Sequence, residues 1–196
     1  MPQRIGILGG TFDPPHLGHL VIAETARVAL DLDHVRLMVA GNPWMKTPGS
    51  PAQRRWQMVQ RALEGADGLV ADDRELHRDG ATYTIDTLID LDGDYPDAQW
   101  FFIVGSDLVD QINQWHRANE VLQRVTLVVV GRPGGDATGR RHLSDVRRID
   151  LPVPPIGISS TELRDRYQHG ESTRYLVPLA VDTYIRTHGL YGAAHA

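Results

Sequence analysis

Short continuous runs of apolar residues recur along this chain, and segments with helical periodicity separate them. A strand buried on both faces is a continuous apolar run, whereas a strand with one face in water alternates apolar and polar residues. The clearest runs are WFFIV at 100–104 and TLVVV at 126–130. The pattern predicts strands at 4–8, 34–39, 69–71, 100–104 and 126–130, and an outer strand at 146–149.

Helical spacing of apolar residues predicts the elements between these strands. One stripe along segment 17–32 is apolar and consists of Leu17, Leu20, Val21 and Val28. Helices are expected at 17–32, 52–63, 83–91, 160–167 and 179–188, and segment 107–122 is expected to hold one broken helix or two short ones. Gly189 is expected to end the last helix at the C′ position, where a left-handed backbone is common.

Alternating strands and helices predict a doubly wound α/β fold, with a mostly parallel sheet and helices on both faces. With 196 residues, the chain is expected to form a single domain with a small C-terminal helical portion from about residue 158. Ligands of such folds lie beyond the carboxyl ends of the strands, where the strand order reverses. Glycine-rich loops at 41–50 and 131–141 follow strand ends, and we expect both to move when ligands bind.

Composition narrows the class of protein. The chain has no cysteine, which excludes disulfides, thiolate metal sites and a cysteine nucleophile. It has no membrane-length apolar run and no secretory signal, so we expect a cytoplasmic protein that does not bind a membrane. The formal net charge of -5 argues against non-specific nucleic-acid binding. Nineteen of the 20 basic residues are arginines, which draws attention to the single lysine, Lys46.

The stretch ILGGTFDPPHLGHL at 7–20 follows the first predicted strand and has the chemistry of an anion site. Gly9 and Gly10 allow backbone N–H groups to approach an anion closely. The following helix N-terminus adds unpaired N–H donors and partial positive charge. His16 and His19 are three residues apart, so both rings face one side of the first turn and can donate to phosphoryl oxygens, more strongly when protonated. Gly18 between them is expected to leave room for a phosphate.

Other interpretations of this stretch remain open at the level of the residues. A single histidine on a helix is more often structural than functional. His16, His19 and Asp13 also offer a zinc ligand set, although no further cluster of His, Asp or Glu occurs at metal-ligand spacing. The glycine pattern is not G-x-G-x-x-G, and no G-x-x-x-x-G-K-[ST] loop occurs, which argues against a dinucleotide fingerprint and excludes a P-loop.

Two motifs together carry a family resemblance. GGTFDPPHLGHL at 9–20 resembles the first signature of the HxGH nucleotidyltransferase superfamily, and ISSTELR at 158–164 resembles the second. Further segments extend the resemblance over nearly the whole chain, to the nicotinate-nucleotide adenylyltransferases: NPWMK at 42–46, TYTIDTL at 82–88, VGSD at 104–107, the region of Trp115 and VGRPG at 130–134. The first of these departs from the family's usual Asn-Pro-Pro-His-Lys.

The resemblance implies a site for ATP and nicotinate mononucleotide, with Mg²⁺ carried by the ATP phosphates and no metal ligand in the protein. It implies a catalytic set of His16, His19, Lys46 and Arg164, with His19 on the phosphate under attack. The residues that it places on ATP are Gly9, Gly10, Thr11, Phe12, His16, His19, Gly105, Asp107, Arg132, Ser160, Thr161 and Arg164. Those that it places on the mononucleotide are Lys46, Thr84 and Trp115, the last stacked on the pyridine ring.

The reaction so implied is transfer of the adenylyl group of ATP to nicotinate mononucleotide, giving nicotinate adenine dinucleotide and pyrophosphate. The sequence leaves alternatives open: another adenylyltransferase of the superfamily with nicotinamide mononucleotide or phosphopantetheine as acceptor, or a nucleotide-binding protein without catalysis. It also leaves open whether the chain forms a homo-oligomer.

Overall fold

A six-stranded parallel sheet forms the centre of the computed structural model, which describes residues 2–43, 47–131, 146–154 and 156–194. The strand order is β3-β2-β1-β4-β5-β6, and every neighbouring pair is parallel. The strands are β1 (Arg4–Gly10), β2 (His34–Val39), β3 (Leu69–Asp72), β4 (Gln99–Gly105), β5 (Val125–Gly131) and β6 (Arg148–Pro152). The predicted doubly wound α/β fold is confirmed, including the outer strand, which begins two residues later than expected.

Helices connect the strands close to where the sequence predicts them. They are α1 (Leu17–Ala29), α2 (Ala52–Ala62), α3 (Thr84–Asp94), α4 (Ala118–Arg124), α5 (Ser160–Gln168) and α6 (Leu179–Thr187). Short 3₁₀ helices are η1 (Arg74–His77), η2 (Ser106–Gln114) and η4 (Leu190–Gly192). Segment 107–122 thus divides into two short helices, the second of the two expected forms. Gly189 lies just past α6 with a left-handed backbone (φ 57°), as predicted.

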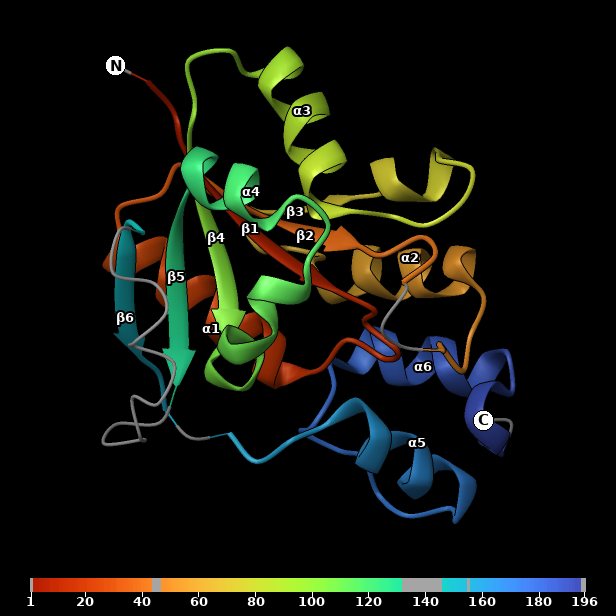
Figure 1. Ribbon diagram of the computed structural model, residues 1–196. Coiled ribbons are helices and arrows are strands. Elements are labelled where there is room, and N and C mark those ends of the chain that lie inside the picture. The colour runs from red at the N-terminus through yellow and green to blue at the C-terminus, as the bar shows by residue number, and fades with distance from the viewer. Residues whose placement is uncertain (1, 44–46, 132–145, 155, 195–196) are drawn as a thin grey trace.

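Helices cover both faces of the sheet (Figure 1). On one face, α3, α4 and η2 enclose a cluster that includes Leu88, Ile112 and Val121. On the other, α1 and α2 enclose a second cluster that includes Ala26 and Val59. Strand residues of both clusters are almost fully buried, which explains why the strands are continuous apolar runs.

The apolar stripe predicted for α1 is only partly correct. Val28 is 64% exposed, while Ala23 and Ala26 are fully buried against the sheet. Small side chains let the helix approach β1 and β2 closely, so the contact face contains alanine rather than the larger apolar residues. Hydrophobicity alone therefore identifies Leu20, which packs against the second cluster, but it includes the exposed Val28 and omits the two buried alanines.

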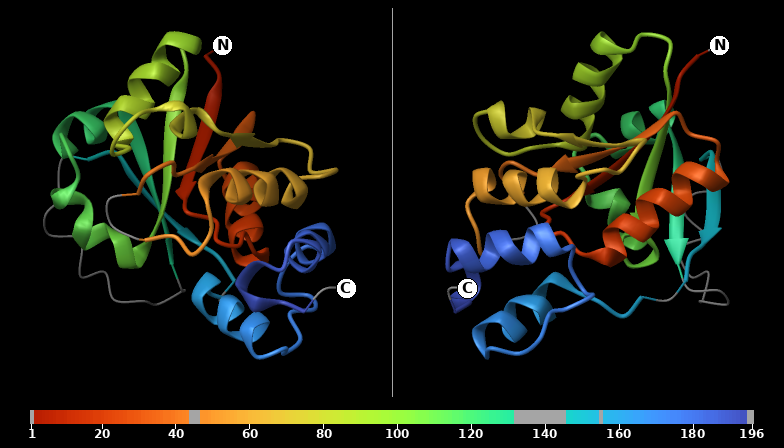
Figure 2. Two further views of the ribbon diagram at one scale, coloured as in Figure 1. Left: turned by 90° about the vertical axis from the view of Figure 1, so that its right-hand side faces the viewer. Right: turned by 180° about the vertical axis from the view of Figure 1, so that it is seen from behind.

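The C-terminal helices form a third core cluster with α2. Met58 and Ala62 of α2 pack with residues of α5 and α6, including Leu163, Val181 and Ile185, all fully buried. In the view from behind in Figure 2, α6 lies directly beneath α2, and α5 lies beyond it. This packing holds α5 near the carboxyl end of the sheet, where it meets the loop after β1.

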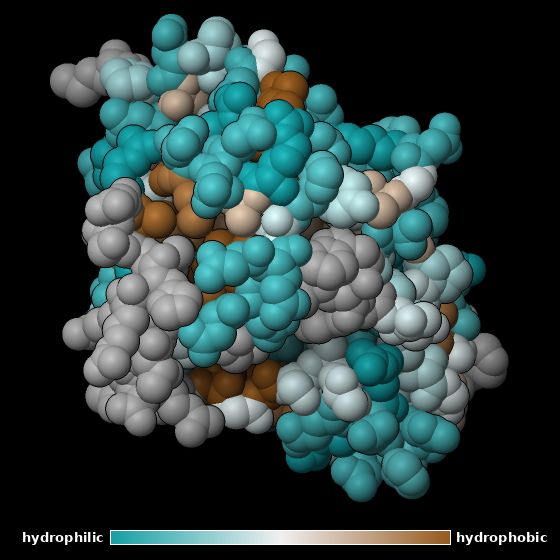
Figure 3. Space-filling model, viewed as in Figure 1, coloured by the Kyte–Doolittle hydropathy of each residue, from teal (hydrophilic) through white to brown (hydrophobic). Residues whose placement is uncertain are grey.

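The strand order reverses between β1 and β4, so their carboxyl ends mark the switch point. The chain after β1 leads to α1 on one face, and the chain after β4 leads to η2 on the other. Most of the molecular face in Figure 3 is hydrophilic, with hydrophobic residues in separate small areas. Among the described residues, no helix is long and apolar enough to cross a membrane.

Candidate active site

The two histidines of the first motif stack against each other at the start of α1. His16 is the N-cap residue, with an extended backbone, and His19 occupies the third helical position. Their ring centroids are 3.8 Å apart. The His16 backbone N–H donates to His19 Nδ1 at 3.2 Å. An accepting Nδ1 carries no proton, so the neutral His19 ring has its proton on Nε2 and donates from there.

His16 lies deeper than His19 and has an unpartnered ring nitrogen. Its side chain is 6% exposed, and Nδ1 has no hydrogen-bond partner within the described part of the chain. Burial lowers the pKa of His16 to about 4, so the ring is neutral near pH 7. Near pH 7 and without a ligand, His16 therefore lacks the protonated form that would donate more strongly. An unsatisfied buried polar atom costs about 1–3 kcal/mol, which a polar ligand atom at Nδ1 would recover.

Gly18 is explained by the His16 ring. A Cβ atom at this position would lie 3.0 Å from both Cε1 and Nδ1 of His16. The glycine between the histidines thus makes room for the neighbouring ring, a more specific reason than the expected space for phosphate. Phe12 supports the pair from the other side, because its buried ring meets the His19 ring edge-on at 5.0 Å.

The second motif contacts the loop of the first directly. Ser160 Oγ donates to the Pro14 carbonyl at 2.9 Å, and Arg164 Nη1 donates to the Asp13 carbonyl at 2.9 Å. Arg164 Nη2 also donates to Thr161 Oγ1 at 3.2 Å. These contacts bridge separations of 146 and 151 residues and place the N-terminus of α5 beside that of α1. Both helix ends carry partial positive charge, which makes the space between them favourable for an anion.

Ser159 caps the N-terminus of α5. Its Oγ accepts from the Glu162 backbone N–H at 3.1 Å. Ser160 is therefore free of capping and holds the first motif instead. One hydroxyl thus caps the start of α5, and the next one joins the two motifs.

Sequence reasoning missed Arg55, a fully buried arginine of α2. Its guanidinium donates to the backbone carbonyls of Thr11, Ala40, Gly41 and Ser50 at 2.7–3.2 Å. It therefore ties the loop after β1 to the end of β2 and to the start of α2. Burial lowers the pKa of Arg55, and the nearby Asp13 carboxylate opposes this effect. Nothing in the sequence distinguishes this arginine from the 18 others.

Asp13 entered the sequence reasoning only as a third zinc ligand, and its contacts give it another role. Its side chain is 2% exposed. Oδ2 accepts from the backbone N–H groups of Gly49 at 2.5 Å and Ser50 at 3.3 Å, and Oδ1 accepts from the Tyr191 hydroxyl at 2.6 Å. Both oxygens are thus occupied by protein donors, which removes the third ligand from the zinc interpretation.

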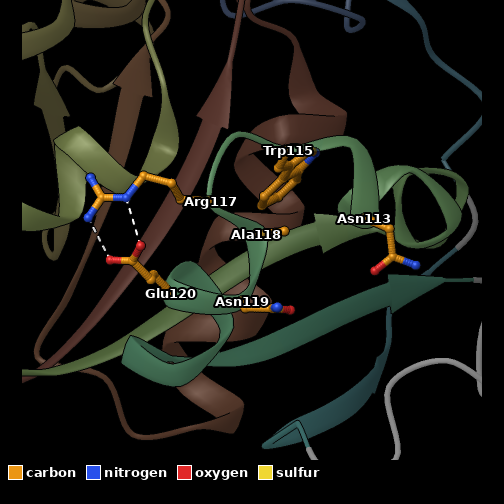
Figure 4. Close-up of a pocket in the computed structure, with 6 residues that line it drawn as sticks. All are labelled: Asn113, Trp115, Arg117, Ala118, Asn119 and Glu120. Atoms are coloured by element: carbon orange, nitrogen blue, oxygen red, sulfur yellow. Dashed lines mark hydrogen bonds and ion pairs between the residues drawn. The ribbon is translucent and has the colours of Figure 1, made fainter.

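On the other side of the switch point, Trp115 lines a pocket of about 340 Å³ that η2 and α4 form (Figure 4). The residues that line it are Asn113, Trp115, Arg117, Ala118, Asn119 and Glu120. The Trp115 ring meets the Phe102 ring of β4 edge-on at 5.4 Å, and the indole is half-buried. Figure 4 shows Arg117 turned away from Trp115 and paired with Glu120, with contacts of 2.6 and 2.7 Å.

Tyr83 and His116 complete this side, and the sequence analysis did not single out either of them. Their rings lie 4.5 Å apart, which joins the N-terminus of α3 to the residue after Trp115. Thr84, expected on the mononucleotide, is the first residue of α3. The structure therefore brings Thr84 and Trp115 to neighbouring segments, and their contacts with the mononucleotide stay predictions.

The remaining site residues divide between described and undescribed parts of the chain. Gly9 and Gly10 end β1, and Gly105 ends β4 beside them at the switch point. Asp107 lies in η2, and the structure does not describe its side chain. Lys46 and Arg132 lie outside the described residues. Their expected contacts stay predictions.

The family comparison covers both motifs. The model of the cytidylyltransferase-like family matches residues 7–166. A protein of Oceanobacillus iheyensis described as "Probable nicotinate-nucleotide adenylyltransferase" is 42% identical over 192 residues, which cover 97% of each chain. A protein of Thermus thermophilus with the same description is 41% identical and covers 96% of this chain and 100% of its own.

Solved structures share the fold. The nicotinic acid mononucleotide adenylyltransferase of Plasmodium falciparum, complexed with NaAD, superposes with a TM-score of 0.82. It is 21% identical and the match covers 98% of each chain. The same Plasmodium falciparum protein complexed with APC gives a TM-score of 0.79. At this identity the likeness establishes the fold, and the sequence relatives establish the family.

Proposed function

Because this chain belongs to the nicotinate-nucleotide adenylyltransferase family, we propose that it transfers the adenylyl group of ATP to nicotinate mononucleotide. The products are nicotinate adenine dinucleotide and pyrophosphate. The observation that carries the proposal is the joining of the two motifs around the histidine pair, through Ser160 on Pro14 and Arg164 on Asp13. An ordinary helix packing gives no reason for two helix N-termini, an arginine and a stacked pair of histidines to converge.

The reaction needs positioning more than covalent catalysis. A phosphate oxygen of the mononucleotide attacks the α-phosphorus of ATP in line, the bond from that phosphorus to the bridging oxygen breaks, and pyrophosphate leaves. An ionised phosphate needs no general base, and no protein nucleophile takes part. The protein contributes alignment and donors for the charge on the phosphoryl oxygens. Mg²⁺ enters with ATP as part of the substrate.

His19 is the donor nearest the reacting phosphate in this proposal. Its Nδ1 is held by the His16 backbone, which aims the proton-bearing Nε2 away from the helix start. The His16 ring stacks on His19, and an anion beside this pair would favour the proton that burial of His16 disfavours. Arg164 and the α5 N-terminus supply positive charge for the outer phosphates. The residues expected on ATP from the resemblance remain part of this proposal.

The mononucleotide side uses Trp115 and the start of α3. Trp115 lines the pocket between η2 and α4, where an aromatic face can stack on a pyridine ring. Backbone N–H groups at the N-terminus of α3, near Thr84, favour a carboxylate over a carboxamide. This difference supports nicotinate mononucleotide as the acceptor, in agreement with the names of the relatives. The cytoplasmic location expected from the sequence belongs to the same proposal.

The test is pyrophosphate release from Mg²⁺-ATP in parallel reactions with nicotinate mononucleotide, nicotinamide mononucleotide and phosphopantetheine. We expect a strong preference for nicotinate mononucleotide and formation of the dinucleotide in equal amount. Release with phosphopantetheine alone would show that the enzyme uses phosphopantetheine, and not nicotinate mononucleotide, as its acceptor. ATP binding without release in any reaction would favour a nucleotide-binding protein without catalysis.

A further inference from the structure

We propose that Tyr191, close to the C-terminal end, is a positioning residue for the adenylyl transfer and acts through Asp13 of the first motif. The inference rests on the proposed function, because a positioning role requires that reaction. The Tyr191 hydroxyl donates to Asp13 Oδ1 at 2.6 Å, across 178 residues of sequence. The contact joins the short helix η4 to the loop between β1 and α1.

Asp13 connects the segments that form the ATP side of the site. Its second carboxylate oxygen accepts from Gly49 and Ser50, at the end of the loop before α2. Its backbone carbonyl accepts from Arg164 of the second motif. A buried carboxylate keeps its place only while donors satisfy its oxygens. Tyr191 supplies a hydrogen bond on Oδ1, so loss of its hydroxyl removes that bond from a buried oxygen.

The backbone is strained at Tyr191 and beside Asp13, the two residues that this hydrogen bond joins. Phe12, next to Asp13, has φ 51°, and Tyr191 has φ 57°. Left-handed backbone is uncommon for aromatic residues and persists where surrounding contacts hold it, often at functional sites. The Phe12 ring in turn packs edge-on against His19. A shift of Asp13 would therefore displace His19, because the neighbouring Phe12 packs against it. It would also displace Arg164, because Arg164 donates to the Asp13 carbonyl.

Tyr191 acts at a distance from the reacting atoms. Its ring belongs to the edge of the third core cluster, and its hydroxyl also lies 3.8 Å from Met58 Sδ. Burial, the Asp13 charge and the hydrogen bond to Asp13 raise the pKa of the Tyr191 phenol, so the group stays protonated and donates. Tyr191 thus holds other groups in place and donates no proton to the substrate.

The test compares two tyrosines of the C-terminal part. Tyr191→Phe removes the hydroxyl on Asp13 and keeps the ring. Tyr184→Phe is the matched control, because its hydroxyl accepts from Arg54 and donates to Gln57, both on α2. We expect kcat to fall about fivefold to tenfold in Tyr191→Phe with little change in either KM, and no loss in Tyr184→Phe. The thermal midpoints of the two variants should fall by similar amounts.

A double-mutant cycle tests the route through Asp13. Asp13→Asn should lower kcat in the same way, and adding Tyr191→Phe should lower it little further, because groups that act through one contact are not additive. Hydrogen exchange at the Gly49 and Ser50 amides should quicken in Tyr191→Phe and stay unchanged in Tyr184→Phe. Independent losses in the cycle, or unchanged exchange, would overturn the route.

The outcomes separate this inference from the proposed function. If the wild-type protein releases no pyrophosphate with any acceptor, that result overturns the proposed function and, with it, the inference that rests on it. If the wild type is active and Tyr191→Phe is equally active, that result overturns the inference about Tyr191 and leaves the proposed function standing. Should Tyr191→Phe unfold below the assay temperature, wild-type kcat in folded Asp13→Asn would overturn the inference by itself.

Discussion

Arg164 donates a hydrogen bond of 2.9 Å to the backbone carbonyl of Asp13, 151 residues earlier in the chain. The second motif is thereby fixed to the first, and the guanidinium lies where two helix N-termini meet. Its second terminal nitrogen donates to Thr161 Oγ1 at 3.2 Å. In the proposed function Arg164 therefore has two roles: it holds the second motif on the first, and it supplies positive charge to the outer phosphates.

Loss of Arg164 should affect activity far more than loss of its helix neighbour. Arg164→Ala should lower kcat about 10²-fold, the scale for one preorganised donor to developing charge. Arg166→Ala is the control, because Arg166 pairs with Glu162 on the exposed side of the same helix. The kcat of each variant is measured from steady-state pyrophosphate release. Equal rates in the two variants would contradict the role of Arg164.

Removal of the His19 ring should lower the rate by about 10²–10³, with the fold retained. The ring is held in place by the His16 backbone and by Phe12, so it acts as a fixed donor. Its loss also frees the His16 N–H, and a stability measurement should accompany the rate. His169→Ala serves as the control, because His169 is the C-cap residue of α5 and its exposed ring contacts the Asp165 carbonyl of that helix. A folded His19→Ala protein with a near-normal rate would remove His19 from the catalytic set.

Trp115 should determine binding of the mononucleotide. Trp115→Ala should raise KM for nicotinate mononucleotide about tenfold, because stacking on an aromatic side chain contributes roughly 1–3 kcal/mol per base. KM for ATP should change little, and Trp115→Phe should recover most of the binding. Initial rates at varied concentrations of each substrate give both constants. An equal rise in both KM values would place Trp115 in the core of the domain instead of the pyridine site.

The strands and most helices follow from the sequence because a parallel sheet buried on both faces requires continuous apolar runs. The contact face of α1 was missed, since close packing on the sheet selects Ala23 and Ala26, which carry a weak hydrophobic signal. The motif residues were found through their resemblance to a family. Arg55, Tyr191 and the carboxylate of Asp13 act through tertiary contacts with backbone groups and distant side chains, which leave no local pattern.

His16 should make the protein less stable in mild acid. Burial lowers its pKa to about 4 in the folded chain, against 6.5 for an exposed histidine. Between these values the unfolded chain binds the proton and the folded chain does not, so the free energy of unfolding falls as pH decreases from 6.5 toward 4. This pKa difference corresponds to about 3 kcal/mol in the free energy of unfolding. Urea unfolding at several pH values, compared with His16→Asn, isolates the contribution, because the other titrating groups remain in both proteins. The wild type should lose about 3 kcal/mol more than the variant over this range. Parallel curves would show that His16 has the same pKa in the folded and the unfolded chain.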